Sequence, residues 1–423
     1  MLFISDEFFV FLVLALVAST LATGGRTRGW ILLAFCAWFY ASWSLPFMGL
    51  LAANIVADYF LALGIAAATS PARRRLMVTA SVTMNLGMLA VFKYAGFGAS
   101  VLNDGLRLLG TGVELPVPQL ILPLGISFYV FQAISYTVDV YRGLLAPTRS
   151  IRQLATFIMF FPHLVSGPIV RAKEILPQLR RVESPPALAD IAHGARDFVV
   201  GFGRKVVFAD PFAQLADATF AAPGAYGGAS LWVGLLAYAL QIYFDFSGYS
   251  QMAVGLARMF GIHFPDNFDA PYIARSLQEF WRRWHISLSR FLRDYLYIPL
   301  GGSRHGLGRT LFALTATMLI GGFWHGANWT FVVWGAIHGV GQAVALVYRE
   351  RRPASHSRWW DTPAGNALGW VLTMATVLLA WVFFRATSVD DAVDYLARLF
   401  ALSPGAALPV SNREMLPWLI PVS

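Results

Sequence analysis

Charged side chains are scarce in this sequence of 423 residues, and their scarcity limits the solvent in which the chain can fold. Asp, Glu, Lys and Arg make up 13% of the chain, whereas about 25% is usual for a soluble domain. Apolar residues make up 57%, and the mean hydropathy is +0.58. So few polar side chains cannot cover a water-exposed surface, which makes lipid the solvent for much of the molecule. We therefore predict one all-α, polytopic membrane domain over residues 1–423.

Cysteine and several catalytic motifs are also missing or nearly so. Cys36 is the single cysteine, which excludes an intramolecular disulfide and a thiolate-rich metal site. The chain lacks the G-x-S-x-G of serine hydrolases, the G-x-x-x-x-G-K-[ST] of nucleotide-hydrolysing loops and the H-E-x-x-H of zinc peptidases. These absences favour a histidine that acts as general base on an incoming hydroxyl, with no metal and no bound cofactor.

Apolar segments of near-membrane length recur along the chain. A spanning helix needs about 20 mostly apolar residues. The candidates are residues 8–23, 30–43, 46–68, 76–97, 118–138, 195–213, 230–250, 310–323, 329–348 and 366–386. Asp6 and Glu7 precede the first segment where a signal peptide would be basic, so we interpret it as a retained span. The pattern predicts about 10 or more transmembrane helices.

Basic residues are distributed unevenly between the connections. Arg26 and Arg28 follow the first candidate span, and three arginines occupy residues 73–75. The alternate connections are residues 44–46, 98–117 and 214–229, and Arg107 is their only basic residue. Because cytoplasmic loops are enriched in Lys and Arg, this asymmetry predicts an N-terminus outside. The net charge of +9 then reflects membrane topology and lipid contact, not a nucleic-acid partner.

Two apolar segments do not fit a simple spanning helix. Residues 157–169 are short and contain two prolines, which favours a re-entrant segment over the alternative of an interfacial loop. Residues 276–297 repeat large apolar side chains at helical spacing, with arginines away from that stripe. This predicts a continuous, basic amphipathic helix at the cytoplasmic interface. Its arginines either anchor lipid headgroups or line a cavity for a phosphate-rich ligand.

His325 stands out among the eight histidines because it lies between two apolar segments, in GGFWHGANW. An imidazole at membrane depth is costly unless it is bonded or used. The glycines around it permit close backbone approach, and Asn328 is placed to orient the ring. Burial favours the neutral imidazole, which can accept a proton. The alternative is a packing histidine bonded to a backbone carbonyl.

His285 and Asp245 are the other two polar residues that we single out. In a continuous helix, His285 lies on the apolar stripe beside Trp281 and Leu288, so we expect it to face protein. Asp245 lies in an apolar segment and needs a partner such as Arg. A structural ion pair and a role in a site fit Asp245 equally well. The remaining histidines are interpreted as loop or span-end residues.

Two of these motifs together resemble the membrane-bound O-acyltransferase family, and within it the alginate O-acetyltransferase branch. They are FWRRWHISLSRFLRDYLYIPLGG at residues 280–302 and GGFWHGANWTFVVWGAIHG at residues 321–339. Further similar segments are residues 122–143, 160–178, 243–262 and 381–386. Gln251 and Ser303 depart from the family pattern, in which we expect an acidic residue and Asn. Residues 415–422 turn apolar again where members of the family usually continue with further helix.

The resemblance implies a multi-helix fold around a central funnel, with His325 catalytic and His285 nearby. It implies transfer of an acetyl group from a cytoplasmic thioester donor, acetyl-CoA, for O-acetylation of an exported polysaccharide such as alginate. It also implies a bacterial inner-membrane location and a periplasmic, SGNH-like acetyltransferase partner. The side chains that we expect to contact donor or substrate are Arg282, Arg283, Trp281, Trp284, Trp324, Asn328 and Asp245.

Three alternatives remain at this point. The same chemistry can serve another cell-envelope polymer, such as peptidoglycan, cellulose or teichoic acid. Intramembrane histidine and aspartate also mark ion paths, so the chain could be a transporter or channel, although it shows no internal repeat of the kind that transporters often carry. The third alternative is a catalytically idle scaffold in a polysaccharide secretion complex.

Overall fold

The computed structural model describes residues 3–165, 167–352, 359–401 and 405–406. Every regular element within these ranges is a helix, apart from one isolated bridge between Tyr226 and Ala406. The all-α prediction is therefore confirmed, whereas the apolar residues 415–422 lie outside the described ranges. The chain divides into two compact units, Met1–Val200 with Ser250–Asp266 and Gly201–Tyr249 with Asn267–Ser423. A single domain over the whole chain stays a prediction.

The first unit is built from helices of very different lengths. They are α1 (Asp6–Leu21), α2 (Gly25–Ala41), α3 (Leu45–Ala67), α4 (Pro71–Leu89), the π-helical turn η1 (Ala90–Tyr94), α5 (Ala95–Leu108), α6 (Ile126–Tyr141), α7 (Ile151–Met159), α8 (Phe161–Leu164), α9 (Ala172–Ile175), the 3-10 turn η2 (Gln178–Glu183) and α10 (Leu188–Gly203). Proline in the first turn marks where α3 and α4 begin, because proline needs no hydrogen-bond partner there.

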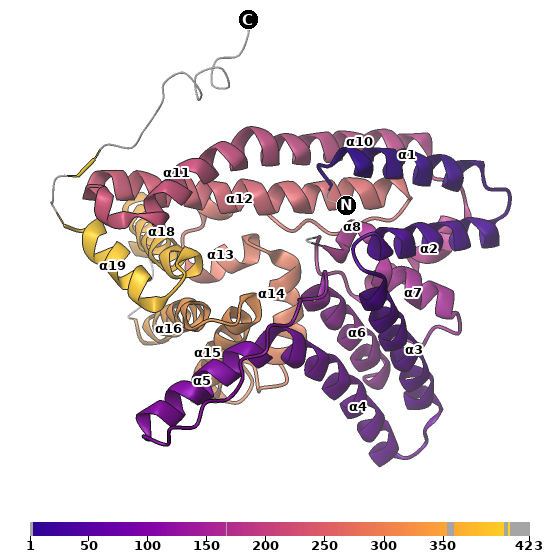
Figure 1. Ribbon diagram of the computed structural model, residues 1–423, viewed down its shortest axis with the longest axis horizontal. Helices are drawn as coiled ribbons and strands as arrows, with labels where there is room; N and C mark the ends of the chain where they lie inside the picture. Colours follow the sequence, from indigo (N-terminus) through magenta and orange to yellow (C-terminus); the bar gives the residue numbers. More distant parts are fainter. Residues whose placement is uncertain (1–2, 166, 353–358, 402–404, 407–423) are drawn as a thin grey trace, which may run out of the picture. The chain divides into compact units, whose positions relative to one another are not determined.

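Helices α3, α4 and α6 lie side by side in the first unit (Figure 1), and a network of polar side chains joins them. Asp58 of α3 accepts hydrogen bonds from Ser81 Oγ at 2.6 Å and Asn85 Nδ2 at 2.9 Å, both on α4. The Ser81 hydroxyl also lies 2.8 Å from Thr137 Oγ1 on α6. Buried polar groups without partners are costly, so this network holds the three helices in one register.

The second unit contains the C-terminal half of the chain and most of one long helix. Its elements are η3 (Arg204–Ala209, π-helical), α11 (Asp210–Ala221), η4 (Pro223–Ala225, 3-10), α12 (Gly228–Met259), η5 (Pro271–Ile273, 3-10), α13 (Leu277–Arg283), α14 (Ile286–Leu292), η6 (Arg293–Tyr297, π-helical), α15 (Gly306–His325), α16 (Trp329–Arg351), α18 (Pro363–Arg385) and α19 (Val389–Leu399). Helix α12 continues past Tyr249 into residues assigned to the first unit.

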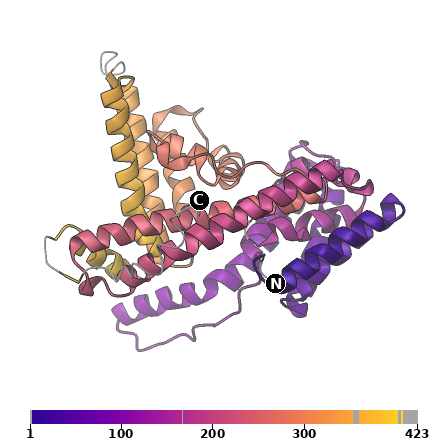
Figure 2. The same cartoon turned by 90° about the horizontal axis from the view of Figure 1, so that it is seen from above.

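The core of the second unit is aromatic and lies against α16 and α18. These two helices run side by side, as the gold ribbons of Figure 2 show, and α15 packs along α16. The Trp334 ring stacks on Trp381 with centroids 6.0 Å apart, and Phe280 stacks on Trp284 at 5.6 Å. Both Trp334 and Trp381 are almost fully buried. This rigid frame carries the segment that contains His285.

The described helices include six that are long and apolar enough to cross a membrane. They are Leu45–Ala67, Pro71–Leu108, Gly228–Met259, Gly306–His325, Trp329–Arg351 and Pro363–Arg385. Helices α1, α2 and α6 coincide with predicted spans but have only 16, 17 and 16 residues. The predicted segment 195–213 is divided between α10, η3 and α11. An integral membrane protein is therefore confirmed, and the count of about 10 or more spans stays a prediction.

The predicted re-entrant segment is broken and almost entirely buried. Helix α7 ends at Met159, Phe160 is extended, and the four-residue α8 follows. Nine residues cannot cross a bilayer. Broken backbone is tolerated at membrane depth only when protein surrounds it, so this packing is compatible with re-entry. The depth of the segment in the membrane stays a prediction.

The prediction of one continuous helix over residues 276–297 is wrong. Helix α13 stops at Arg283, Trp284 is extended, and His285 adopts the left-handed conformation with φ 44° and ψ 55° before α14 begins. The loop before η5 replaces the helical hydrogen bonds. The Asp269 amide donates to the Arg283 carbonyl at 2.9 Å, and the Ile286 amide donates to the Asn267 carbonyl at 3.0 Å.

Candidate active site

His325 is the last residue of α15, at the turn of a tight helical hairpin. Gly326 follows in extended conformation, and Asn328 caps α16 by accepting a hydrogen bond from the Thr330 amide at 3.0 Å. The Asn328 amide nitrogen donates to the Thr387 carbonyl at 2.8 Å. The side-chain oxygen and nitrogen of Asn328 thus each form a hydrogen bond with a backbone atom. Asn328 therefore caps the start of α16, and its role in orienting the imidazole stays a prediction.

Glycines bring α15 and α16 into close contact, as the sequence predicted. A β-carbon on Gly322 would lie 2.4 Å from the Phe331 carbonyl, and one on Gly335 would lie 2.5 Å from the Met318 carbonyl. A β-carbon on Gly326 would overlap the Phe331 ring at 2.0 Å. Small residues permit such backbone approach between membrane helices. The hairpin therefore fixes His325 relative to the side chains of α16.

His285 is held at the break between α13 and α14 and is 1% exposed. The carboxamide oxygen of Asn267 accepts hydrogen bonds from Ser287, from its amide at 3.1 Å and its hydroxyl at 2.9 Å. This clamp fixes the first turn of α14. Neither ring nitrogen of His285 has a hydrogen-bond partner among the described residues. His285 therefore faces protein, as predicted, but with its polar atoms uncommitted.

Trp324 lies between the two histidines and brings them into one site. Its ring centroid is 4.9 Å from that of His325 and 6.3 Å from that of His285. The Phe246 ring covers the other side of His285, edge-on at 4.6 Å. Burial, with a smaller contribution from the charge of His325, holds the pKa of His285 well below its usual range. At neutral pH, His285 is an uncharged imidazole packed among aromatic rings.

Two residues of α16 join this site that sequence reasoning missed. Trp334 contacts His325 edge-on, with centroids 5.2 Å apart, and His338 lies 4.9 Å from Trp334. His338 is fully buried inside α16, so its interpretation as a span-end or loop histidine is wrong. The four-residue spacing of Trp334 and His338 was the available signal, because it places both on one face of the same helix.

The predicted tryptophans of α13 and the following turn are both structural parts of the aromatic core. The Trp281 indole nitrogen donates a hydrogen bond to His338 Nδ1 at 3.3 Å. Trp284 is 4% exposed and contacts Phe268 edge-on at 5.1 Å and Trp381 at 5.1 Å. Trp281 therefore acts on the site through His338, whereas Trp284 forms the packed surface on which the His285 segment rests.

The two predicted phosphate-binding arginines have different surroundings. Arg283 pairs with Asp269 and Glu279, with nitrogen-to-oxygen distances of 3.1 Å in both cases. Arg282 is exposed, and the described residues offer it no ion pair. A guanidinium held by two carboxylates has little capacity left for a ligand phosphate. Arg282 is therefore the better candidate for donor binding.

Asp245 has the cationic partner that its place in an apolar helix requires. Lys205 Nζ lies 2.6 Å from Asp245 and 2.8 Å from Asp210, and it bridges η3, α11 and α12. Burial alone would lower the pKa of Lys205, but hydrogen bonds to the two carboxylates outweigh it and raise the pKa. The ion pair explains the position of Asp245 without a ligand, and the partner is Lys where Arg was suggested.

No group of three or more His, Cys, Asp or Glu side chains in the described ranges is arranged to hold a metal ion.

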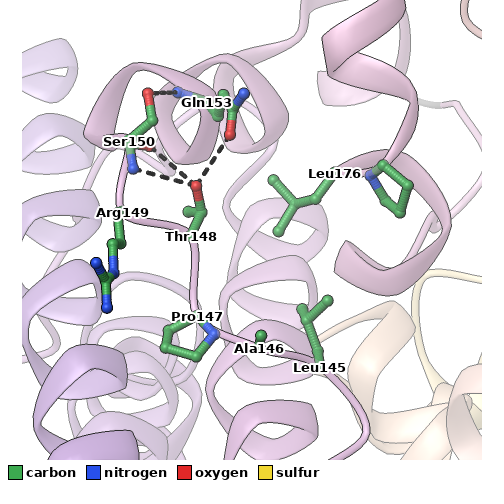
Figure 3. Close-up of a pocket in the computed structure, with 9 residues that line it drawn as sticks. Leu145, Ala146, Pro147, Thr148, Arg149, Ser150, Gln153 and Leu176 are labelled. Atoms are coloured by element: carbon green, nitrogen blue, oxygen red, sulfur yellow. Dashed lines mark hydrogen bonds between the residues drawn. The ribbon is translucent and has the colours of Figure 1, made fainter.

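A cavity of about 710 Å³ opens in the first unit around the loop that precedes α7 (Figure 3). Thr148, Ser150 and Gln153 line it and bond one another, with Thr148 Oγ1 donating to Gln153 Oε1 at 3.0 Å. None of the predicted site residues lines this cavity.

Comparisons with known proteins show which family the chain resembles in sequence. A sequence profile of the membrane-bound O-acyltransferase family matches residues 144–384, a range that contains both histidine motifs. The chain is 44% identical over 406 residues to a protein of Azotobacter vinelandii named probable alginate O-acetylase AlgI, covering 95% of this chain and 78% of that one.

Two further relatives carry names that specify other polymers. The peptidoglycan O-acetyltransferase of Helicobacter pylori is 38% identical over 411 residues, covering 91% of this chain and 76% of that one. The teichoic acid D-alanyltransferase of Streptococcus thermophilus is 28% identical over 284 residues, covering 62% and 68%. The profile match spans more than half of the described chain. With this match, the 44% identity to the Azotobacter vinelandii protein and its apolar helices, the chain belongs to the membrane-bound O-acyltransferase family and is an O-acyltransferase of the membrane.

Proposed function

We propose that this protein transfers an acetyl group from acetyl-CoA, supplied on the cytoplasmic side, for O-acetylation of an exported polysaccharide such as alginate. The observation that carries the proposal is the pairing of a half-buried His325 with a fully buried His285 across the Trp324 ring. The name of the Azotobacter vinelandii relative supports acetyl as the acyl group and alginate as the polymer.

The residues of the site suggest how the reaction proceeds. His325 removes the proton from the acceptor hydroxyl, whose oxygen attacks the acyl carbon of the thioester. The carbon–sulfur bond then breaks, and the leaving thiolate takes up the proton that His325 holds. His285 is uncharged, its ring nitrogens make no hydrogen bond within the described part of the chain, and it positions or polarises one of the reactants. Donor and acceptor aligned in a water-poor site account for much of the acceleration.

The proposed reaction sets the orientation and the partners of the chain. Arg282 lies at the cytoplasmic side and contacts the donor's phosphates. The protein is in the bacterial inner membrane with its N-terminus outside, as the distribution of arginines favours. A periplasmic, SGNH-like acetyltransferase completes transfer to the polymer. A second candidate acceptor is peptidoglycan, favoured by the 38% identity to the Helicobacter pylori enzyme.

The test is acetyl transfer from radiolabelled acetyl-CoA by the purified protein in nanodiscs. We expect His325→Ala to abolish acetyl release and transfer while the protein still inserts into the membrane. His305→Ala is the matched control, because His305 is an exposed histidine at the start of the same helix. Full activity in His325→Ala would remove the assigned base. Supplying alginate or peptidoglycan fragments as acceptors distinguishes the two polymers.

A further inference from the structure

Helix α16 presents two buried N–H donors to the active site without an acceptor for either. They are the Trp334 indole Nε1 and His338 Nε2, in side chains that are 1% and 0% exposed. Neither atom has a hydrogen-bond partner among the described residues. Since the two residues are four apart in one helix, their side chains lie one above the other on the same face.

The hydrogen bond from Trp281 decides which nitrogen of His338 carries the proton. An indole N–H can only donate, and here it donates to His338 Nδ1 at 3.3 Å. The Nδ1 atom therefore supplies a lone pair, and in the neutral ring the proton is on Nε2. His338 is in this way set as a donor, directed away from Trp281.

Leaving two such donors unpaired costs stability. An unsatisfied buried polar group costs about 1–3 kcal/mol, and native structures rarely keep two neighbours in that state without a use for them. The rings around Trp334 and His338 come from Phe280, Trp281, His325, Trp381 and Phe384. Only His325 carries a hydrogen-bond acceptor of ordinary strength, and Trp334 Nε1 does not bond to it. We therefore look to a bound molecule for the acceptor.

The position of Trp334 indicates which atom of a bound molecule this is. Its ring lies between two imidazoles, 5.2 Å from His325 and 4.9 Å from His338. A group bound there is next to the general base. Neutral donors that are buried among apolar rings stabilise a developing oxyanion strongly, because little solvent competes for it. A thioester carbonyl is the group that develops such a charge.

We propose that Trp334 Nε1–H and His338 Nε2–H bind the carbonyl oxygen of the acyl donor, an inference that rests on the proposed function. When the acceptor oxygen bonds to the acyl carbon, the π electron pair of the carbonyl moves onto the carbonyl oxygen. The two N–H donors stabilise the negative charge that develops there. The pair then returns, the carbon–sulfur bond breaks, and the thiolate takes the proton from His325. Trp281 is a positioning residue, because it acts on the carbonyl through His338.

The first test removes each donor and keeps a ring in its place. We expect Trp334→Phe and His338→Phe each to lower kcat by about 10²-fold, with KM for acetyl-CoA changed much less. Trp232→Phe is the matched control, since Trp232 lies at the edge of the second unit's core against Phe400. Values of kcat within about threefold of wild type in both site variants would overturn the proposal.

A second measurement separates hydrogen bonding from general damage to the fold. Acetyl-CoA is compared with its dithioester analogue, in which a sulfur atom, a weaker acceptor, replaces the carbonyl oxygen. We expect the oxygen-to-sulfur rate ratio to fall by about tenfold in each variant. An unchanged ratio would overturn the proposal even if kcat fell, because misfolding lowers both rates equally. The proposed function fails separately, if wild type transfers no acetyl group or His325→Ala still does.

Discussion

His285 has two features that each destabilise the folded protein, so a purely structural role does not account for it. It is one of two described non-glycine residues with positive φ, the other being Ala270. A β-carbon in that conformation costs about 1–2 kcal/mol, and the buried imidazole has no hydrogen-bond partner among the described residues. Strain and an unsatisfied polar group in one residue are typical of a functional site. The Asn267 clamp on Ser287 holds the residue in place despite these costs.

A glycine and alanine pair at position 285 measures the backbone cost. We expect His285→Gly to be more stable than His285→Ala by about 1 kcal/mol, because only alanine keeps the β-carbon. The same pair at Ser289, inside α14, should give the opposite order by about the same amount. Apparent melting temperatures in detergent give both differences.

Both His285 variants should also lose most acetyl transfer, since each removes the imidazole. If alanine proved as stable as glycine at 285, the left-handed conformation of this residue would be wrong. If activity persisted in both, His285 would serve packing only.

Among the elements, the α15–α16 hairpin has the tightest packing in the site. A β-carbon on Gly322 would lie 2.4 Å from a backbone carbonyl, so Gly322→Ala must push α15 away from α16. His325 is one turn further along α15, and its contact with Trp334 would be lost. We expect kcat to fall by about 10²-fold, because displacement of about 1 Å at a reacting group has that effect.

Gly308→Ala in the same helix is the control for this prediction. A β-carbon at Gly308 meets nothing within 4.0 Å, so we expect unchanged kcat and stability equal to or up to about 1 kcal/mol above wild type. Steady-state kinetics and melting temperature of both variants provide the comparison. Wild-type kcat in Gly322→Ala would show that the hairpin does not set the geometry of His325.

Periodicity predicted the helices of this protein better than the breaks within them. Residues 46–68 and 329–348 match α3 and α16 closely, because long apolar runs have one stable form in lipid. The turn at His285 was missed, since a single left-handed residue leaves the three- and four-residue spacing nearly intact. What imposes it is Asn267, eighteen residues earlier, whose backbone and side-chain bonds no local pattern reveals.

The sequence predicted the two histidines of the candidate site, but not the residues that surround them. The apolar surroundings of His325 and the stripe beside His285 marked both residues. His338 lies in an equally apolar helix, but its importance depends on Trp281 and Trp334, which only the folded chain brings to it. From the sequence we expected Arg283 to be available for a ligand phosphate. In the structure it forms ion pairs with Asp269 and Glu279.

For the whole molecule, fully buried neutral histidines make stability depend on pH. His163 in the first unit is surrounded by Phe157, Phe160 and Phe264, and burial lowers the pKa of His163 to about 3. An unfolded histidine titrates near about 6.5. Between these values the unfolded chain binds a proton that the folded chain does not, so stability is full above about pH 6.5 and falls as pH decreases.

We expect this one residue to cost about 1.4 kcal/mol of unfolding free energy for each pH unit below about 6.5. His163→Phe removes the proton site and keeps an aromatic ring among aromatic neighbours, so the loss of stability between pH 7 and pH 5 should become smaller by about 2 kcal/mol. His193→Phe is the control, because His193 is an exposed histidine of the same unit. Apparent melting temperatures of wild type and both variants across this range measure the effect. If the stability of His163→Phe changed with pH as much as that of wild type, His163 would be protonated in the folded protein. The aromatic rings around it would then admit water.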